Sequence, residues 1–142
     1  MTKVDLTVTG GDHLSRAFDE LNAETKAAIA KVNNAIGLEL RGDIVRRYNS
    51  GPATGRVYKK YKPDRIHRAS AADEAPMTDT GTLAGGMIYK EVSDKSVMVG
   101  NTVFYAPILE FALGRPAWVP AIEAITPKYR RLLQTAIDRF MP

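Results

Sequence analysis

Residues 22–48 read NAETKAAIAKVNNAIGLELRGDIVRRY, and this stretch decides the fold. Apolar side chains recur in it every three or four residues, at Ile29, Val32, Ile36, Leu40, Ile44 and Tyr48. This spacing places them on one face of an α-helix. Gly37 and Gly42 each weaken an isolated helix by about 1 kcal/mol relative to alanine. The stretch therefore predicts a long helix that depends on packing against the rest of the chain.

The residues before this helix predict a strand and a short helix. Residues 3–9 alternate between polar and apolar side chains and are followed by two glycines; Val4, Leu6 and Val8 share one face. Such alternation is typical of a half-buried strand. Asp12 can then cap a short helix that carries Leu14, Phe18 and Leu21. An alternative interpretation joins this helix to the long one as a single kinked helix.

The second half of the chain predicts a hairpin and a terminal helix. Residues 87–92 and 96–100 have the composition of two strands, joined by a three-residue turn. Residues 105–111 fit either a short helical turn or an extended segment. Residues 120–125 predict a helical turn, after which Thr126 and Pro127 predict the cap and first position of a separate final helix. That helix places five apolar side chains on one face: Tyr129, Leu133, Ala136, Ile137 and Phe140.

Together these segments predict a single α+β domain over residues 1–142, a length that suits one domain. The N-terminal strand and the hairpin would form a small β-sheet packed against the long helix, because each presents one apolar face. A long basic loop, at about residues 50–77, and a C-terminal helix complete the expected fold.

The composition excludes several classes of protein. The chain has no cysteine, so it has no disulfide, no thiolate nucleophile and no cysteine-bearing metal site. Its two histidines, His13 and His67, lie far apart in the sequence. No apolar run approaches the roughly 20 residues that cross a bilayer, and the first residues do not resemble a signal peptide. We expect a small soluble domain, made inside the cell, with no membrane partner.

Positive charge is concentrated in the loop and in the end of the helix before it. Residues 41–70 contain nine lysines and arginines against two aspartates, so this segment carries +7 in a chain whose total is +4. The loop also holds Tyr58 and Tyr61 and shows no sustained helical or strand period. Its side chains could bind nucleic acid, with phosphates on the cations and bases on the rings, could meet an acidic protein surface, or could be solvated.

The sequence offers no residue set for catalysis, cofactor binding or metal binding. Asp79-Thr80-Gly81 is the triplet of aspartic proteases, but the residues before it lack the apolar strand that such a site requires. We expect Asp79 or Thr80 to bond nearby backbone amides in a turn or helix cap. Residues 81–86 are glycine-rich but lack the lysine and the spacing of a phosphate-binding loop. The chain is therefore expected not to be an enzyme.

Two segments, taken in order, resemble a known protein family. The first reads HRASAADEAP over residues 67–76 and TDTGTL over residues 78–83; the second reads VFYAPILEF over residues 103–111 and RPAWVPAI over residues 115–122. In this order they resemble the small head–tail joining, or neck, proteins of long-tailed double-stranded DNA bacteriophages, also described as minor tail or tail completion proteins. The helices on either side match the family in order and length. One departure is that Ala112-Leu113 precedes Gly114, where the family has a glycine directly after its Glu-aromatic pair.

The resemblance implies a structural virion protein without catalytic activity or cofactor. Its subunits would assemble into a homo-oligomeric ring, hexameric or otherwise dodecameric, around a lumen that holds packaged double-stranded DNA without sequence preference. Its partners would be portal-side connector or tail tube proteins at the head–tail junction of the viral tail, assembled in the cytoplasm of the bacterial host. The charge of the loop leaves a basic nucleic-acid-binding module as the alternative.

The residues expected at subunit interfaces come from the loop and from the second motif. A long basic loop with few aliphatic residues cannot order itself by burying its own surface, so we expect it to pack on an adjacent subunit or ring protein. Glu110 lies between two apolar residues and is expected to pair with Arg115, and Trp118 is expected in the core. The interface candidates are Arg56, Tyr58, Lys59, Lys60, Tyr61, Lys62, Arg65, His67, Arg68, Tyr105, Glu110, Phe111 and Arg115.

Overall fold

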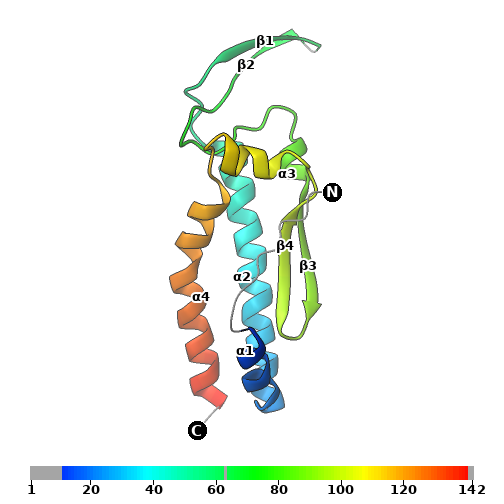
Figure 1. Ribbon diagram of the computed structural model, residues 1–142, viewed down its shortest axis with the longest axis vertical. Coiled ribbons are helices and arrows are strands. Elements are labelled where there is room, and N and C mark those ends of the chain that lie inside the picture. The colour runs from blue at the N-terminus through cyan, green and yellow to red at the C-terminus, as the bar shows by residue number, and fades with distance from the viewer. Residues whose placement is uncertain (1–10, 63, 141–142) are drawn as a thin grey trace.

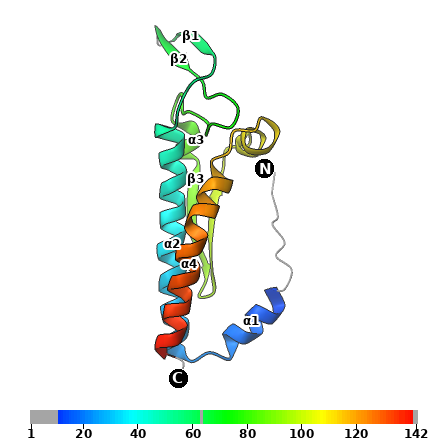
Figure 2. The ribbon, with the colours of Figure 1, turned by 90° about the vertical axis from the view of Figure 1, so that its left-hand side faces the viewer.

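Two long helices lie side by side and antiparallel, with two small antiparallel sheets of two strands each (Figures 1 and 2). The computed structural model describes residues 11–62 and 64–140. The elements in order are helices α1 (Gly11–Asp19) and α2 (Ala23–Ser50), strands β1 (Val57–Tyr61) and β2 (Asp64–Arg68), helix α3 (Thr82–Gly85), strands β3 (Met87–Ser93) and β4 (Ser96–Asn101), the π-helix η1 (Ile108–Ala112) and helix α4 (Trp118–Phe140). The predicted α+β class is confirmed.

The long helix predicted from residues 22–48 is α2. Asn22 adopts an extended backbone and its side chain accepts a hydrogen bond from the Thr25 amide at 2.8 Å, which caps the helix and separates it from α1. Ile29, Ile36, Ile44 and Tyr48 of the predicted apolar face are buried. The interpretation as two helices is therefore confirmed over the single kinked helix.

The predicted hairpin is β3–β4, and it packs against α2. A side-chain carbon on Gly37 would lie 2.8 Å from Val97 Cγ2 and 2.9 Å from Tyr89 Cε2, so glycine is what allows the sheet to approach the helix. The Tyr89 hydroxyl also donates to Asn34 Oδ1 at 3.0 Å. The strand expected over residues 3–9 lies outside the described residues.

The buried core lies where the C-terminal half of α2 meets α3, β3 and the start of α4. It contains Ile44, Tyr48, Leu83, Met87, Ala106, Ala117 and Ala121. Trp118 packs against this cluster, as predicted, and its Nε1 donates to the Tyr48 hydroxyl at 2.9 Å. Burial raises the pKa of Tyr48, so this hydroxyl stays protonated. The core therefore joins the last turns of α2 to the beginning of α4.

The terminal helix corrects the prediction of a break at Thr126-Pro127, because α4 runs unbroken through Pro127. Proline in a helix interior removes one backbone hydrogen bond and costs about 3 kcal/mol. Contacts with α2 directly after the proline help to offset this cost: Lys128 Nζ donates to Glu39 Oε2 at 2.6 Å and the Tyr129 hydroxyl donates to Asn33 Oδ1 at 2.8 Å. Tertiary packing thus overrides the local signal.

Within the part of the chain that the structure describes, no helix combines the length and hydropathy needed to cross a bilayer. The segment at residues 105–111, for which the sequence left two possibilities, is helical and contributes most of η1.

Candidate functional site

The segment expected to be a loop at about residues 50–77 contains a β-hairpin, which corrects the prediction. Strands β1 and β2 pair antiparallel, with Lys59 opposite Ile66 and Tyr61 opposite Asp64. The hairpin projects beyond the end of α2, away from the two-helix body (Figures 1 and 2). We call residues 55–70 the arm. Neither face of the arm belongs to the core, so the strands lack the polar–apolar alternation by which sequence reasoning finds strands.

The foot of the arm is fixed by backbone hydrogen bonds and one carboxylate. The Gly55 amide donates to the Ala69 carbonyl at 2.8 Å, and a side chain on Gly55 would lie 2.5 Å from the Ser70 carbonyl oxygen. Glu74 accepts from the amides of Thr54 at 3.0 Å and Ala71 at 2.8 Å, and from the Thr54 hydroxyl. These hydrogen bonds, the one from the Thr54 hydroxyl foremost, lower the pKa of Glu74. Glu74 therefore ties together the two ends of the arm.

The face of the arm turned toward the body is anchored on Asp79. Lys60 Nζ lies 2.9 Å from Asp79 Oδ2, the Arg65 guanidinium contacts Oδ1, and His67 Nδ1 lies 3.7 Å from Oδ1. The hydrogen bond from Lys60, reinforced by Arg65, holds the pKa of Asp79 below its ordinary value despite partial desolvation. Asp79 is thus ionised and bridges both strands of the arm to the segment before α3.

This role corrects the prediction that Asp79 or Thr80 caps a turn. The backbone amide of Gly81 is bonded instead by the Thr78 hydroxyl, at 2.9 Å. Thr80 shares a hydrogen bond with the Thr82 hydroxyl at 2.7 Å. The turn therefore forms without Asp79, whose carboxylate is committed to the arm.

The outer face of the arm carries three exposed apolar side chains. Because side chains alternate along each strand, Val57 and Tyr61 of β1 and Ile66 of β2 share the face opposite to Lys60 and Arg65. Val57 is 44%, Tyr61 77% and Ile66 75% exposed. The Lys59 ammonium lies 5.3 Å from the centre of the Tyr61 ring. On this face each apolar side chain lies opposite a charged one: Val57 opposite Arg68, Ile66 opposite Lys59 and Tyr61 opposite Asp64.

A second exposed apolar surface is formed by the segment around η1. We call it the η1 patch; it consists of Phe104, Ile108, Phe111 and Leu113, which are 72%, 47%, 70% and 51% exposed. The patch spans ten consecutive residues, which include the whole of η1. Patches of this kind mark interaction sites on soluble proteins.

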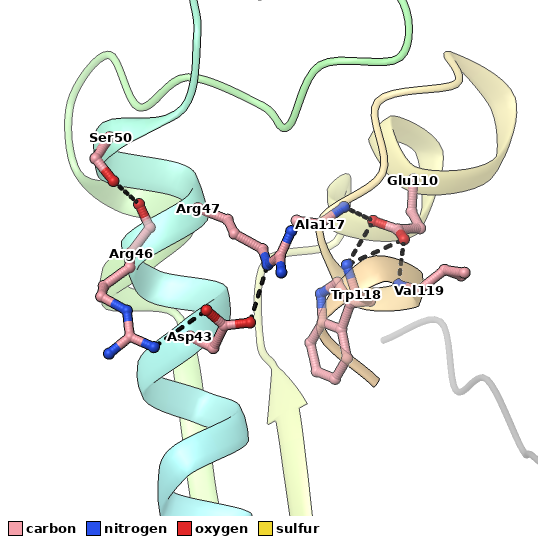
Figure 3. Close-up of polar contacts among 8 residues, drawn as sticks. All are labelled: Asp43, Arg46, Arg47, Ser50, Glu110, Ala117, Trp118 and Val119. Atoms are coloured by element: carbon pink, nitrogen blue, oxygen red, sulfur yellow. Dashed lines mark hydrogen bonds and ion pairs between the residues drawn. The ribbon is translucent and has the colours of Figure 1, made fainter. Parts of the chain in front are cut away.

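Glu110 belongs to the same segment, and the expectation that it pairs with Arg115 is wrong. It is buried, and its carboxylate accepts hydrogen bonds from the backbone amides of Ala117 at 2.8 Å, Trp118 at 3.1 Å and Val119 at 3.0 Å (Figure 3). Its partners are thus the free amides at the start of α4, where a negative charge is favourable, rather than the side chain of Arg115. Figure 3 also shows Asp43 pairing with Arg46 and Arg47 near the end of α2.

The structure brings some of the interface candidates together and separates others. Nine lie on the arm, and of these only Lys60, Arg65 and His67 face Asp79. Tyr105 and Arg115 line, with His67 and Asp79, a pocket of about 180 Å³ at the foot of the arm. Phe111 is exposed on the η1 patch, whereas Glu110 is buried and serves the fold.

Sequence reasoning missed the apolar residues Val57, Ile66 and Phe104 and the anchoring role of Asp79. A local signal for the hairpin exists: Lys62-Pro63 separates two five-residue segments that contain tyrosine, valine and isoleucine. Nothing local marks Asp79, because its partners come from two other strands.

Comparison of the chain with protein-family models, with curated proteins and with solved structures finds no match. Among the described residues, no group of three or more histidines, aspartates or glutamates is placed to hold a metal ion. The site is therefore defined by its surfaces: a basic arm with an apolar outer face, and the η1 patch.

Proposed function

We propose that this chain is a structural phage virion protein that forms a ring at the head–tail junction, in a neck, tail completion or tail terminator role. One observation carries the proposal: the chain builds a projecting arm, fixes its foot with Glu74 and its inner face with Asp79, and leaves apolar side chains exposed on its outer face. An ordered element that exposes apolar surface is suited to contact another protein. The resemblance of residues 67–83 and 103–122 to head–tail joining proteins supports placing this contact at the junction of a phage head and tail.

The use of the acidic residues supports assembly rather than catalysis. Glu74 is occupied by the amides and hydroxyl at the foot of the arm, Asp79 by the cations of the arm, and Glu110 by the amides of α4. The hydrogen bonds and ion pairs of Glu74 and Asp79 lower the pKa of each carboxyl group, which makes both poor proton donors near neutral pH.

In this proposal, identical subunits make head-to-tail contacts that close into a ring, six-fold by resemblance and twelve-fold as the next choice. The ring would surround packaged double-stranded DNA and contact portal-side connector or tail tube proteins. Contacts of this type use two different surfaces of each subunit, and the arm and the η1 patch are two such surfaces.

Two experiments test this function. Light scattering after size exclusion, followed by negative-stain electron microscopy, should show rings when the protein is concentrated or mixed with neighbouring virion proteins. Particles made without the protein should yield full heads without tails together with free tails. A chain that stays monomeric under all these conditions, or particles that join normally without it, would contradict the proposal.

A DNA-binding module remains the second candidate, because one observation favours it. The arm is a two-stranded antiparallel ribbon that carries Arg56, Lys59, Lys62 and Arg68 besides the two cations on Asp79. The major groove of DNA admits a two-stranded ribbon. Tight binding to duplex DNA by a monomer, with a steep dependence on salt, would favour this candidate over the ring.

A further inference from the structure

We propose that the outer face of the arm of one copy docks on the η1 patch of the next copy. This inference rests on the proposed ring function and names the two surfaces that would form its subunit contact. The arm supplies Val57, Tyr61 and Ile66, and the patch supplies Phe104, Ile108, Phe111 and Leu113.

The arm cannot cover the patch of its own chain in this structure. Lys60 and Arg65 on the inner face of the arm are held against Asp79. The opposite face, with Tyr61 and Ile66, is therefore turned away from Asp79 and the segment before α3. Two apolar surfaces that cannot meet within one chain can meet between two copies. Such a contact joins different surfaces of identical subunits, the kind of interface that generates rings.

The charges of the two surfaces are compatible. On the outer face of the arm, Lys59 and Arg68 lie beside the apolar side chains, and Asp64 lies opposite Tyr61. Residues 104–114 contain no lysine or arginine, and their one charged residue is Glu110, buried beneath the patch. The outer face of the arm, with two cations and one carboxylate, therefore meets a segment that carries no positive charge of its own. Aromatic and aliphatic side chains with polar or charged neighbours are also usual at protein interfaces.

The exposed aliphatic side chains favour a protein partner over DNA. Ile66 is 75% exposed in the middle of β2, opposite Lys59 and diagonal to Tyr61 on the same face. Phosphates would use the cations of the arm but would leave the isoleucine and valine in water, whereas the phenylalanines of the η1 patch would bury them.

The size of the contact predicts weak pairs and a stronger ring. A buried aromatic side chain contributes roughly 150–250 Å², so the arm's three partly exposed side chains can bury on the order of 300 Å². A standard interface buries about 800 Å² per partner. One arm contact is therefore too small for a stable dimer. In a closed ring each copy uses both its arm and its patch, so each copy makes two such contacts. No arm or patch is then left without a partner, and the ring is more stable than a pair.

Cysteine cross-linking tests the contact directly, because the chain has no cysteine of its own. Ile66→Cys and Phe111→Cys are made as separate proteins, both at exposed positions where substitution disturbs the fold little. The two proteins are mixed at ring-forming concentration and treated with a short bis-maleimide. We expect cross-linked dimers in the mixture and not in either protein alone. The double variant should give a ladder that ends at the ring size.

A matched control uses Val92→Cys, at a position that is 59% exposed on β3, in place of Phe111→Cys. Equal cross-linking of Ile66→Cys to Val92→Cys, or cross-linking of Ile66→Cys to itself, would overturn the inference.

If microscopy shows rings but Ile66→Cys and Phe111→Cys do not cross-link, the inference is wrong and the proposed function stands. If no ring forms and no cross-link appears, both fail. If a short DNA duplex, and not added protein, shields Ile66→Cys from maleimide, the arm binds DNA and the inference is wrong.

Discussion

At the scale of single residues, Glu110 shows how one buried carboxylate positions a helix. Three consecutive amides of residues 117–119 point at it, at distances between 2.8 and 3.2 Å. Because Trp118 belongs to this set and also bonds Tyr48, the same contact fixes the start of α4 against the core. The carboxylate is the acceptor that the first amides of a helix lack within the helix itself.

Replacing Glu110 with alanine should lower the free energy of unfolding by about 2–4 kcal/mol, because it leaves buried amides without an acceptor. Urea denaturation followed by circular dichroism measures the change. Glu123→Ala, at an exposed position of the same helix, is the control and should change stability by no more than about 0.5 kcal/mol. Equal effects of the two substitutions would show that Glu110 does not act as a helix cap.

Asp79 is the second residue that decides a larger arrangement, because Lys60 and Arg65 belong to different strands of the arm. Asp79→Asn should loosen the arm from the body and leave the core intact. Spin labels attached to Tyr61→Cys and Val92→Cys report the distance between arm and body. The distance distribution should broaden in the Asp79→Asn variant and stay narrow in Asp94→Asn, a control at an exposed turn residue.

The same measurement has an expected pH dependence. The pKa of Asp79 is lowered in the folded state by Lys60 and Arg65, so the anchored arm favours the ionised carboxylate. The stabilisation is complete above the ordinary aspartate pKa of about 3.9 and is lost only as the pH falls through the lowered value. The distribution should therefore stay constant from about pH 7 to about pH 5. Broadening within that range would contradict this assignment.

At the scale of elements, helices and the packed hairpin follow from local pattern, whereas the arm and the unbroken α4 do not. The apolar period of residues 22–48 and the cap at Asn22 are sufficient to define α2. Pro127 wrongly predicts a helix break, because the contacts of Lys128 and Tyr129 that hold the helix together are with α2, about 90 residues earlier in the chain. The arm escapes pattern recognition because neither face is buried in its own chain. The basic residues of the candidate site could be predicted from the sequence. Which of them face Asp79 and which lie on the outer face depends on the register of β1 and β2, which the sequence alone does not show.

Two glycines of α2 give a paired test of how the helix meets the sheet. Gly42→Ala should stabilise the protein by about 1 kcal/mol, because no atom beyond the adjacent residues and the nearby helix backbone lies within 4 Å of the added carbon. Gly37→Ala should destabilise it, since the carbon would fall 2.8 Å from Val97 Cγ2 and overpacking costs about 1–3 kcal/mol. Thermal unfolding of both variants measures the difference. Stabilisation by Gly37→Ala would mean that β3–β4 is not packed against α2 as described.

At the scale of the whole molecule, the body and the arm differ in the interactions that stabilise them. The body has a buried cluster shared by α2, α3, β3 and α4. The arm has five paired positions, an anchor at Asp79 and an outer face that is open to water. A two-stranded hairpin without a buried face is only marginally stable in water. The arm is therefore the part of the molecule that gains most from a partner.

Hydrogen exchange should separate these two parts. In the free protein, the amides of residues 57–68 should exchange much faster than those of α2 near Ile44, because the arm can open without unfolding the core. In assembled rings the arm should become protected, and the residues around η1 should gain protection with it, while α2 near Ile44 stays unchanged. Asp94 and its neighbours in the β3–β4 turn serve as an internal reference that assembly leaves exposed. Strong protection of the arm in the monomer would show that it orders itself, and an arm that remains unprotected in rings would show that assembly does not use it.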